Sequence, residues 1–247
     1  TVIIFDGMEA FFRGCIGVKM LAEFVPQLHM IMTGQLKWFG FDPKYLSFSE
    51  SCYMGPMTFS EFLSNLREPE LVESLEKLTP SRLIKEGDHK RLLTYFQQFL
   101  MCGGLPSVVH NKLSKDGLLE EELTTRQSSP SISEQHLAYL ELLQRGIKKR
   151  VRFSKNRCVQ RVFNSIHHFV GASTKYKQLD PNHVPHRIQE SINDLSESFM
   201  IHRVMGSTGE SVMLEDHAKY KKMKLYYPDL SLLHALFSEQ LFNRSPQ

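Results

Sequence analysis

The chain has 247 residues, enough for one or two domains that each bury a hydrophobic core. Hydrophobic residues make up 41% and charged residues 23%, which excludes a disordered chain, while a net charge of +3 selects no class of partner. The sequence contains no run of about 18 apolar residues and no basic-then-apolar leader, so no membrane segment is expected. Its 4 cysteines are scattered without a CxxC motif, which favours a reducing cytoplasm.

The N-terminal residues predict a strand, a helix and a second strand. The apolar run Val2–Phe5 is typical of a strand buried on both faces, residues 17–27 have helical spacing, and residues 28–34 form another apolar strand. This order predicts a parallel βαβ unit, in which chemistry collects beyond the carboxyl ends of the strands. Asp6 and the segment Thr33-Gly34-Gln35 are therefore expected at one edge of the sheet.

The middle of the chain predicts helices with recognisable ends. Thr58 or Ser60 is expected to cap a helix that begins in "MTFSEFLSNL", and residues 68–145 are mostly helical. A long helix is expected to stop at Gly103-Gly104, because glycine favours the conformation that ends a helix. Ser131 or Ser133 is expected to cap the helix that follows a polar break.

The C-terminal third predicts short helices followed by strands. Residues 156–171 are expected to form one helix, and residues 184–199 another, with Ile188, Ile192, Leu195 and Phe199 on a single apolar stripe. The segment "MIHRVMGSTGESVML" predicts a strand, a glycine-rich turn and a second strand, and "KKMKLYYPDLSLLHAL" predicts a last strand and a closing helix.

Five short blocks occur in an order that resembles a known family. They are "TVIIFDGMEAF", similar to a Walker B strand; "LHMIMTGQL", similar to a sensor strand; "MGPMTFSEFL"; "YFQQFLMCGGLPSVV"; and "KMKLYYPDLSLLHAL". Together they resemble the AAA-like P-loop ATPases of bacteria and archaea that carry a C-terminal region of helices and a winged-helix unit. The blocks are spread over residues 1–236, nearly the whole chain.

The resemblance implies an α/β fold: an incomplete parallel P-loop NTPase-type sheet, then a helical segment and a winged-helix-like α+β domain. The corresponding domains are residues 1–67, 68–145 and 146–247. The implied ligands are ATP or ADP with Mg²⁺. Asp6 would bind the metal, Thr33 would contact the nucleotide, and Asp6, Glu9 and Gln35 are the candidate catalytic residues. The alternatives are that Asp6 is a turn or helix-cap residue, that Thr33 and Gln35 only make hydrogen bonds at the strand end, and that Glu9 is a solvated first-turn residue.

The departures from the family pattern concern the chemistry. No GxxxxGKS/T loop occurs in the chain, and in the family that loop would precede Thr1. Gly7 follows Asp6 where the family has glutamate, and loss of a water-activating carboxylate costs about 10²–10⁴-fold in rate. The Gly-Arg pair expected before "MGPMTFSEFL" is also absent. The sequence therefore predicts a nucleotide-responsive switch with weak or absent hydrolysis, against the alternative of a non-catalytic scaffold that binds a protein partner.

A basic stretch suggests a third function, binding of nucleic acid by the winged-helix unit. Residues 145–161 hold eight basic residues and no acidic one, and Arg187 lies on the expected recognition helix. A solvated face, or a partner for the acidic run at residues 118–123, is the alternative. The candidate nucleic-acid contacts are Lys148, Lys149, Arg150, Arg152, Lys155, Arg157 and Arg187.

A metal site is not expected at the histidines. His183 and His186 are spaced H-x-x-H, and no cysteine or carboxylate cluster accompanies them at metal-site spacing.

Overall fold

The computed structural model describes most of the chain, and its described part is mainly helical. It forms ten α-helices, a two-stranded parallel sheet and a two-stranded antiparallel sheet. The chain divides into two compact units, residues 1–54 with 145–226 and residues 55–144 with 227–247. The described residues are 2–7, 14–34, 50, 52–80, 83–115, 130–150, 153–208, 210, 212–213 and 218–244.

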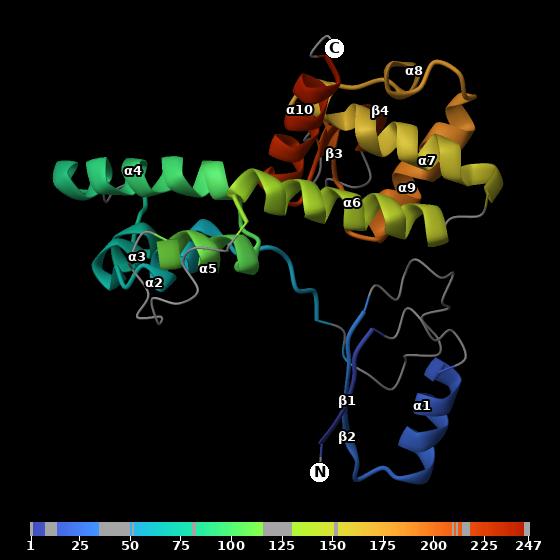
Figure 1. The fold of residues 1–247 in the computed structure, drawn as a ribbon, viewed down its shortest axis with the longest axis horizontal. Helices are drawn as coiled ribbons and strands as arrows, with labels where there is room; N and C mark the ends of the chain where they lie inside the picture. Colours follow the sequence, from blue (N-terminus) through green and yellow to red (C-terminus); the bar gives the residue numbers. More distant parts are fainter. Residues whose placement is uncertain are drawn as a thin grey trace. The chain divides into compact units, whose positions relative to one another are not determined.

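The first unit contains the predicted βαβ element. Strand β1 (Val2–Phe5) and strand β2 (His29–Met32) are joined through helix α1 (Gly14–Phe24) and pair in parallel, with Val2 opposite His29. Figure 1 shows the two strands side by side, with α1 next to them. Val18 of α1 is buried against Phe5, Met30 and Met32. The prediction of a parallel βαβ unit is confirmed.

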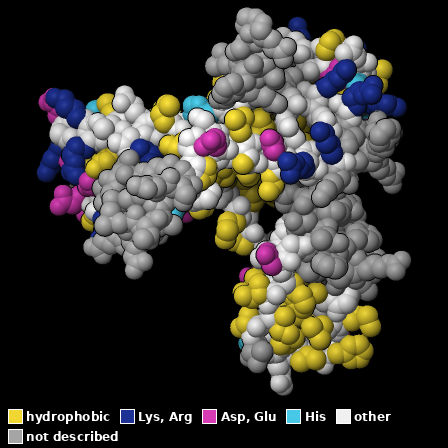
Figure 2. Space-filling model, viewed as in Figure 1, with side chains coloured by type: hydrophobic (Ala, Val, Ile, Leu, Met, Phe, Trp, Pro, Cys, Tyr) yellow, Lys and Arg dark blue, Asp and Glu magenta, His cyan; other side chains and the backbone are white. Residues whose placement is uncertain are grey.

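The prediction that the first strand is buried on both faces is wrong. Val2, Ile4 and Ile31 are 56%, 64% and 50% exposed, because they alternate with the residues that face α1 and point to the other side of the sheet. In Figure 2, hydrophobic side chains gather over the region of β1, α1 and β2. This sheet has two strands in the described part of the chain, where a P-loop fold is not evident.

The remainder of the first unit is a helical group followed by a hairpin. Its elements are α7 (Phe153–Ser165), the 3₁₀ helix η5 (Ile166–Phe169), α8 (Tyr176–Leu179), α9 (Pro185–Glu197), β3 (His202–Ser207) and β4 (Ala218–Tyr226). Helix α7 packs on α9. Ile188, Ile192 and Leu195 are fully buried, as the apolar stripe predicts, but Phe199 is 40% exposed. Phe199 lies beyond the end of α9 and has a φ of 57°, so it no longer follows the helical backbone that aligns the other residues of the stripe.

Strand β3 pairs in antiparallel with β4, and not with the strand predicted around residues 211–214. His202 lies opposite Tyr226, and the register shifts between Met205 and Gly206. Of the additional strand predicted around residues 211–214, the structure describes residues 212 and 213, which are exposed and do not lie in a strand. Residues 218–226 form the partner instead, because Met223 and Leu225 alternate into the core.

A third segment extends this sheet by a single bridge. Thr174, which lies between η5 and α8, pairs with Met223 of β4, and its backbone N–H donates to the Met223 carbonyl oxygen at 2.9 Å. The chain order is therefore helix α7, bridge, helices α8 and α9, and hairpin.

The second unit is built from helices. They are α2 (Phe59–Asn65), α3 (Pro69–Glu76), α4 (Glu86–Cys102), α5 (Pro106–Lys115), the first part of α6 (Ile132–Arg150), and α10 (Leu230–Arg244). Phe62, Leu63 and Leu71 are fully buried in its core. Among the described residues, no helix has both the length and the apolar character needed to cross a membrane.

The predicted helix ends in this unit are confirmed by their hydrogen bonds. Thr58 caps α2, since its hydroxyl accepts from Glu61 N–H at 3.3 Å while the Glu61 carboxylate accepts from Thr58 N–H at 2.7 Å. Ser131 makes the same reciprocal pair with Glu134 at the start of α6. Helix α4 ends at Gly103, whose φ of 73° requires the glycine expected there.

Asp229 joins three segments of the second unit that are far apart in sequence. Its buried carboxylate accepts from Gly104 N–H at 2.6 Å and from Ser231 N–H at 2.7 Å. The Gly104 carbonyl oxygen in turn accepts from Met57 N–H at 2.7 Å. Three of the sequence blocks that carry the family resemblance thus meet at one buried junction, which we call the Gly-Gly junction (Met57, Gly103, Gly104, Asp229, Ser231).

The Gly-Gly junction leaves no room for a side chain at Gly104. A Cβ there would overlap the Met57 carbonyl oxygen and would lie 3.0 Å from Met57 N. Both atoms belong to the Met57 backbone, which its N–H bond to the Gly104 carbonyl oxygen already holds in place, so it cannot move aside at low cost.

We predict that Gly104→Ala lowers the free energy of unfolding by about 1–3 kcal/mol, because the added methyl group overpacks the junction. The matched control is Gly87→Ala in α4, where a Cβ meets nothing within 4 Å. This control should raise stability by up to about 1 kcal/mol, because alanine loses less backbone entropy in a helix. Urea unfolding of both variants provides the measurement, and equal effects would contradict the junction's steric constraint.

Candidate functional site

The predicted edge of the βαβ unit brings two of the candidate residues together. Asp6 follows β1 and Thr33 follows β2, and the Thr33 hydroxyl donates to Asp6 Oδ1. Thr33 N–H also donates to the Phe5 carbonyl oxygen at 2.9 Å, which continues the parallel ladder up to this edge. Asp6 is exposed, so its second carboxylate oxygen can meet solvent or a cation. Glu9 and Gln35 lie outside the described residues.

Gly7 adopts a conformation that limits what can replace it. Its φ is 66°, which is left-handed backbone, although a Cβ built there would meet nothing within 4 Å. Space is therefore available for a side chain, but a non-glycine residue would cost about 1–2 kcal/mol in backbone strain. The position that holds glutamate in the resembled family is occupied here by a residue suited to a turn.

The predicted nucleic-acid residues divide between those with a described side chain and those without. Lys148 on α6, Arg157 on α7 and Arg187 on α9 are exposed. Lys149, Arg150 and Lys155 lie on described backbone with side chains that are not described, and Arg152 lies outside the described residues. Arg157 and Arg161 stand four residues apart on the exposed side of α7. In Figure 2, Lys and Arg side chains gather over the region of α7 and α8.

Two histidines lie beside the Gly-Gly junction. His136 Nε2 contacts the Cys102 carbonyl oxygen at 2.9 Å, and His234 Nε2 contacts the Leu100 carbonyl oxygen at 2.8 Å. The two rings stack with centroids 5.8 Å apart. His136 is only 2% exposed. Burial lowers the pKa of His136 below its ordinary value, against the opposing effect of the Cys102 contact.

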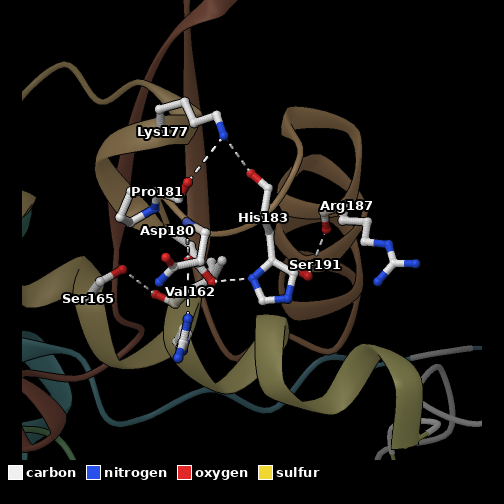
Figure 3. A network of polar contacts seen from close by, with 10 residues as sticks. Val162, Ser165, Lys177, Asp180, Pro181, His183, Arg187 and Ser191 are labelled. Atoms are coloured by element: carbon white, nitrogen blue, oxygen red, sulfur yellow. Dashed lines mark hydrogen bonds and ion pairs between the residues drawn. The ribbon is translucent and has the colours of Figure 1, made fainter.

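A cluster that sequence spacing does not indicate forms between α7 and the loop before α9. Cys158 Sγ, an Asp180 carboxylate oxygen and a His183 ring nitrogen all lie within 4.8 Å of one another. His183 Nδ1 lies 2.6 Å from Asp180 Oδ2, and Asn182 N–H donates to Asp180 Oδ1 at 2.9 Å. Figure 3 shows the His183 ring facing Asp180. We refer to Cys158, Asp180 and His183 as the Cys-Asp-His cluster.

The Cys-Asp-His cluster is mostly removed from solvent. Cys158 is 2% exposed and Asp180 is 1% exposed, whereas the side chain of His183 is 16% exposed. Burial raises the pKa of the Cys158 thiol, and the nearby Asp180 charge acts in the same direction.

Sequence spacing missed this cluster because its cysteine lies on α7, far in sequence from the loop that carries Asp180 and His183. The signal present in the sequence is the D-x-x-H turn at Asp180–His183, 22 residues after Cys158. His186, the other half of the H-x-x-H pair, points elsewhere and contacts Glu190 at 3.5 Å.

We predict that His136 makes the stability of the protein depend on pH. Because its pKa is lowered on folding, the unfolded chain binds more protons, so the contribution is fully present above about pH 6.5 and is lost as pH falls through the folded pKa. In His136→Gln, the free energy of unfolding should fall less between about pH 8 and pH 5 than in the wild type. Urea unfolding across this range provides the measurement, and parallel curves for the two proteins would contradict the prediction.

The family comparison covers the helical and C-terminal parts of the chain. Residues 93–243 match the family model described as a domain of unknown function (DUF8612). This range begins in α4 and ends in α10, so it includes Gly104, Asp229 and the Cys-Asp-His cluster. No curated protein and no solved structure matches the chain. Because the match spans more than half of its 247 residues, the chain belongs to the DUF8612 family.

Proposed function

We propose that the protein is a P-loop ATPase-like nucleotide switch of the cytoplasm with weak or absent hydrolysis. The observation that supports it is the meeting of Asp6 and Thr33 at the carboxyl edge of two parallel strands. In α/β sheets this edge is where ligands bind. Had the two side chains been far apart, or the strands antiparallel, the proposal would have lost its basis.

The residues at this edge suit a hard cation. Asp6 offers a carboxylate and Thr33 a hydroxyl, and Mg²⁺ prefers oxygen ligands of this kind, usually together with nucleotide phosphates. Bound Mg²⁺ would neutralise phosphate charge, while the protein would hold the nucleotide in place.

Weak turnover follows from Gly7. A glycine cannot orient or activate a water molecule, and its left-handed backbone disfavours a substituted carboxylate. Such a protein can respond to nucleotide binding without consuming nucleotide quickly. A scaffold that binds a protein partner and no nucleotide is the outcome if the following test fails.

We predict that ATP with Mg²⁺ stabilises the full-length protein against thermal unfolding, by about 2.7 kcal/mol when the ligand is at about 100 times its dissociation constant. Asp6→Asn should abolish the part of the shift that depends on Mg²⁺, because the amide cannot replace the carboxylate as a metal ligand. Glu23→Gln on α1, an exposed carboxylate of the same βαβ unit, is the control and should keep the full shift. No shift in the wild type, or the same shift in Asp6→Asn, would overturn the proposal.

A second function, binding of nucleic acid, is favoured by the order of elements in the first unit. A helix, a bridged segment, two helices and a hairpin follow one another from α7 to β4, with Thr174 bridged to Met223. This is the order of a winged helix, in which α9 would be the recognition helix. Arg157, Arg161 and Arg187 are exposed on its helices, although Glu190 and Glu197 on α9 would repel phosphate.

For this second function we predict a steep dependence of DNA affinity on salt. The double variant Arg157→Gln/Arg187→Gln should reduce the slope of log K against log salt by about 2, since each lost phosphate contact contributes about 0.9. Lys90→Gln on α4 in the second unit is the control, because Lys90 is exposed and ion-paired with Glu86. Binding to a short duplex DNA can be followed by fluorescence anisotropy, and an unchanged slope in the double variant would exclude this surface.

A further inference from the structure

We propose that the Cys-Asp-His cluster binds a thiophilic divalent cation of the Zn²⁺ class. The three side chains come from two separate segments, Cys158 from α7 and Asp180 and His183 from the loop between α8 and α9. One donor atom of each lies within 4.8 Å of the others. Ligands of a tetrahedral zinc ion are separated by about 3.3–3.6 Å, given bonds of about 2.0–2.3 Å, so the side chains need to shift by about an ångström.

The donor set is selective in its chemistry. A thiolate is a soft ligand and an imidazole an intermediate one, and their combination with a carboxylate suits zinc rather than magnesium or calcium. Three protein ligands leave a fourth position for water, as in zinc sites that are not purely structural. The partly exposed His183 side chain provides the side of the cluster from which an ion and a water molecule can enter.

The loop that carries two of the ligands is held in place by its own contacts. Lys177 Nζ donates to the carbonyl oxygens of Pro181 at 3.2 Å and His183 at 3.0 Å. Asn182 N–H donates to Asp180 Oδ1 at 2.9 Å, which forms a tight turn over the carboxylate. These bonds, visible in Figure 3 for Lys177, position the loop without a metal, so binding would need only side-chain adjustment.

The largest adjustment concerns His183 and Asp180. Their contact atoms, Nδ1 and Oδ2, are 2.6 Å apart, closer than two ligands of one tetrahedral ion. A cation bound to both atoms would replace the hydrogen bond between them, the neutral imidazole then carrying its proton on Nε2, and binding to Cys158 Sγ would release the thiol proton to solvent. The thiolate and the carboxylate would together balance the charge of a divalent ion.

Two arginines near the Cys-Asp-His cluster carry positive charges that oppose the binding of a cation. Arg161 lies 3.6 Å from Asp180 Oδ1 and already balances part of the buried charge. Arg187 carries a second positive charge near Cys158. The alternative is that the cluster binds no metal and only supports the α8–α9 loop through its hydrogen bonds. In that case the tetrahedral cobalt bands sought in the following experiment should be absent.

The experiment uses Co²⁺ as a spectroscopic substitute for Zn²⁺ on the full chain after removal of metal by a chelator. The proposal predicts one Co²⁺ per chain, with the intense visible bands of a tetrahedral ion and a near-ultraviolet thiolate-to-cobalt band, both removed by stoichiometric Zn²⁺. Cys158→Ser should lose the thiolate band, and His183→Gln should weaken binding by at least about tenfold, as loss of a ligand does at metal sites.

Matched controls separate the site from general effects on folding. His186→Gln and Cys52→Ser alter an exposed histidine and an exposed cysteine, and both should bind Co²⁺ as the wild type does. Circular dichroism in chelator checks that each variant is folded, and His183→Gln serves if Cys158→Ser is not. Only weak octahedral cobalt bands in the folded wild type, or a thiolate band that survives in folded Cys158→Ser, would overturn the proposal.

Discussion

The buried carboxylate of Asp229 is the interaction on which the second unit depends. It accepts two backbone N–H groups, from Gly104 and Ser231, and thereby fixes the segment before α10 against the end of α4. Hydrogen bonds to a charged group contribute about 1.5–3 kcal/mol each, and the buried donors would otherwise remain unsatisfied. The two glycines follow from this contact, because any side chain at Gly104 would displace the Met57 backbone.

The βαβ unit and the Cys-Asp-His cluster illustrate two ways of building a site. At the βαβ edge, Asp6 and Thr33 meet because parallel strands bring their carboxyl ends to the same side. In the cluster, Cys158 on a helix meets a turn that carries two ligands. The first edge offers oxygen ligands, where we propose a nucleotide-bound Mg²⁺, whereas the second offers sulfur, nitrogen and one carboxylate oxygen, where we propose Zn²⁺. The two proposals therefore concern different ions and can fail separately.

The outer face of β1 and β2 is apolar and yet exposed in the described part of the chain. Parallel sheets are normally covered on both faces, and a two-stranded sheet is marginal by itself. Val2, Ile4 and Ile31 point outward in this structure, although they are the residue types of a fully buried strand. The apolar run predicted the strand correctly and its burial wrongly. The residue types of a strand show that it can be buried, but they do not show whether another element covers it.

Local signals were sufficient for the helices, their ends and the parallel pairing. Thr58, Ser131 and Gly103 act within a few residues of themselves, so their roles can be recognised without knowing the fold. Contacts across the chain were decided only by packing: Asp229 reaches Gly104 over 125 residues, and Cys158 reaches the Asp180–His183 turn because α7 packs on α9. No spacing rule encodes such a meeting, since it depends on how buried faces of separate helices combine.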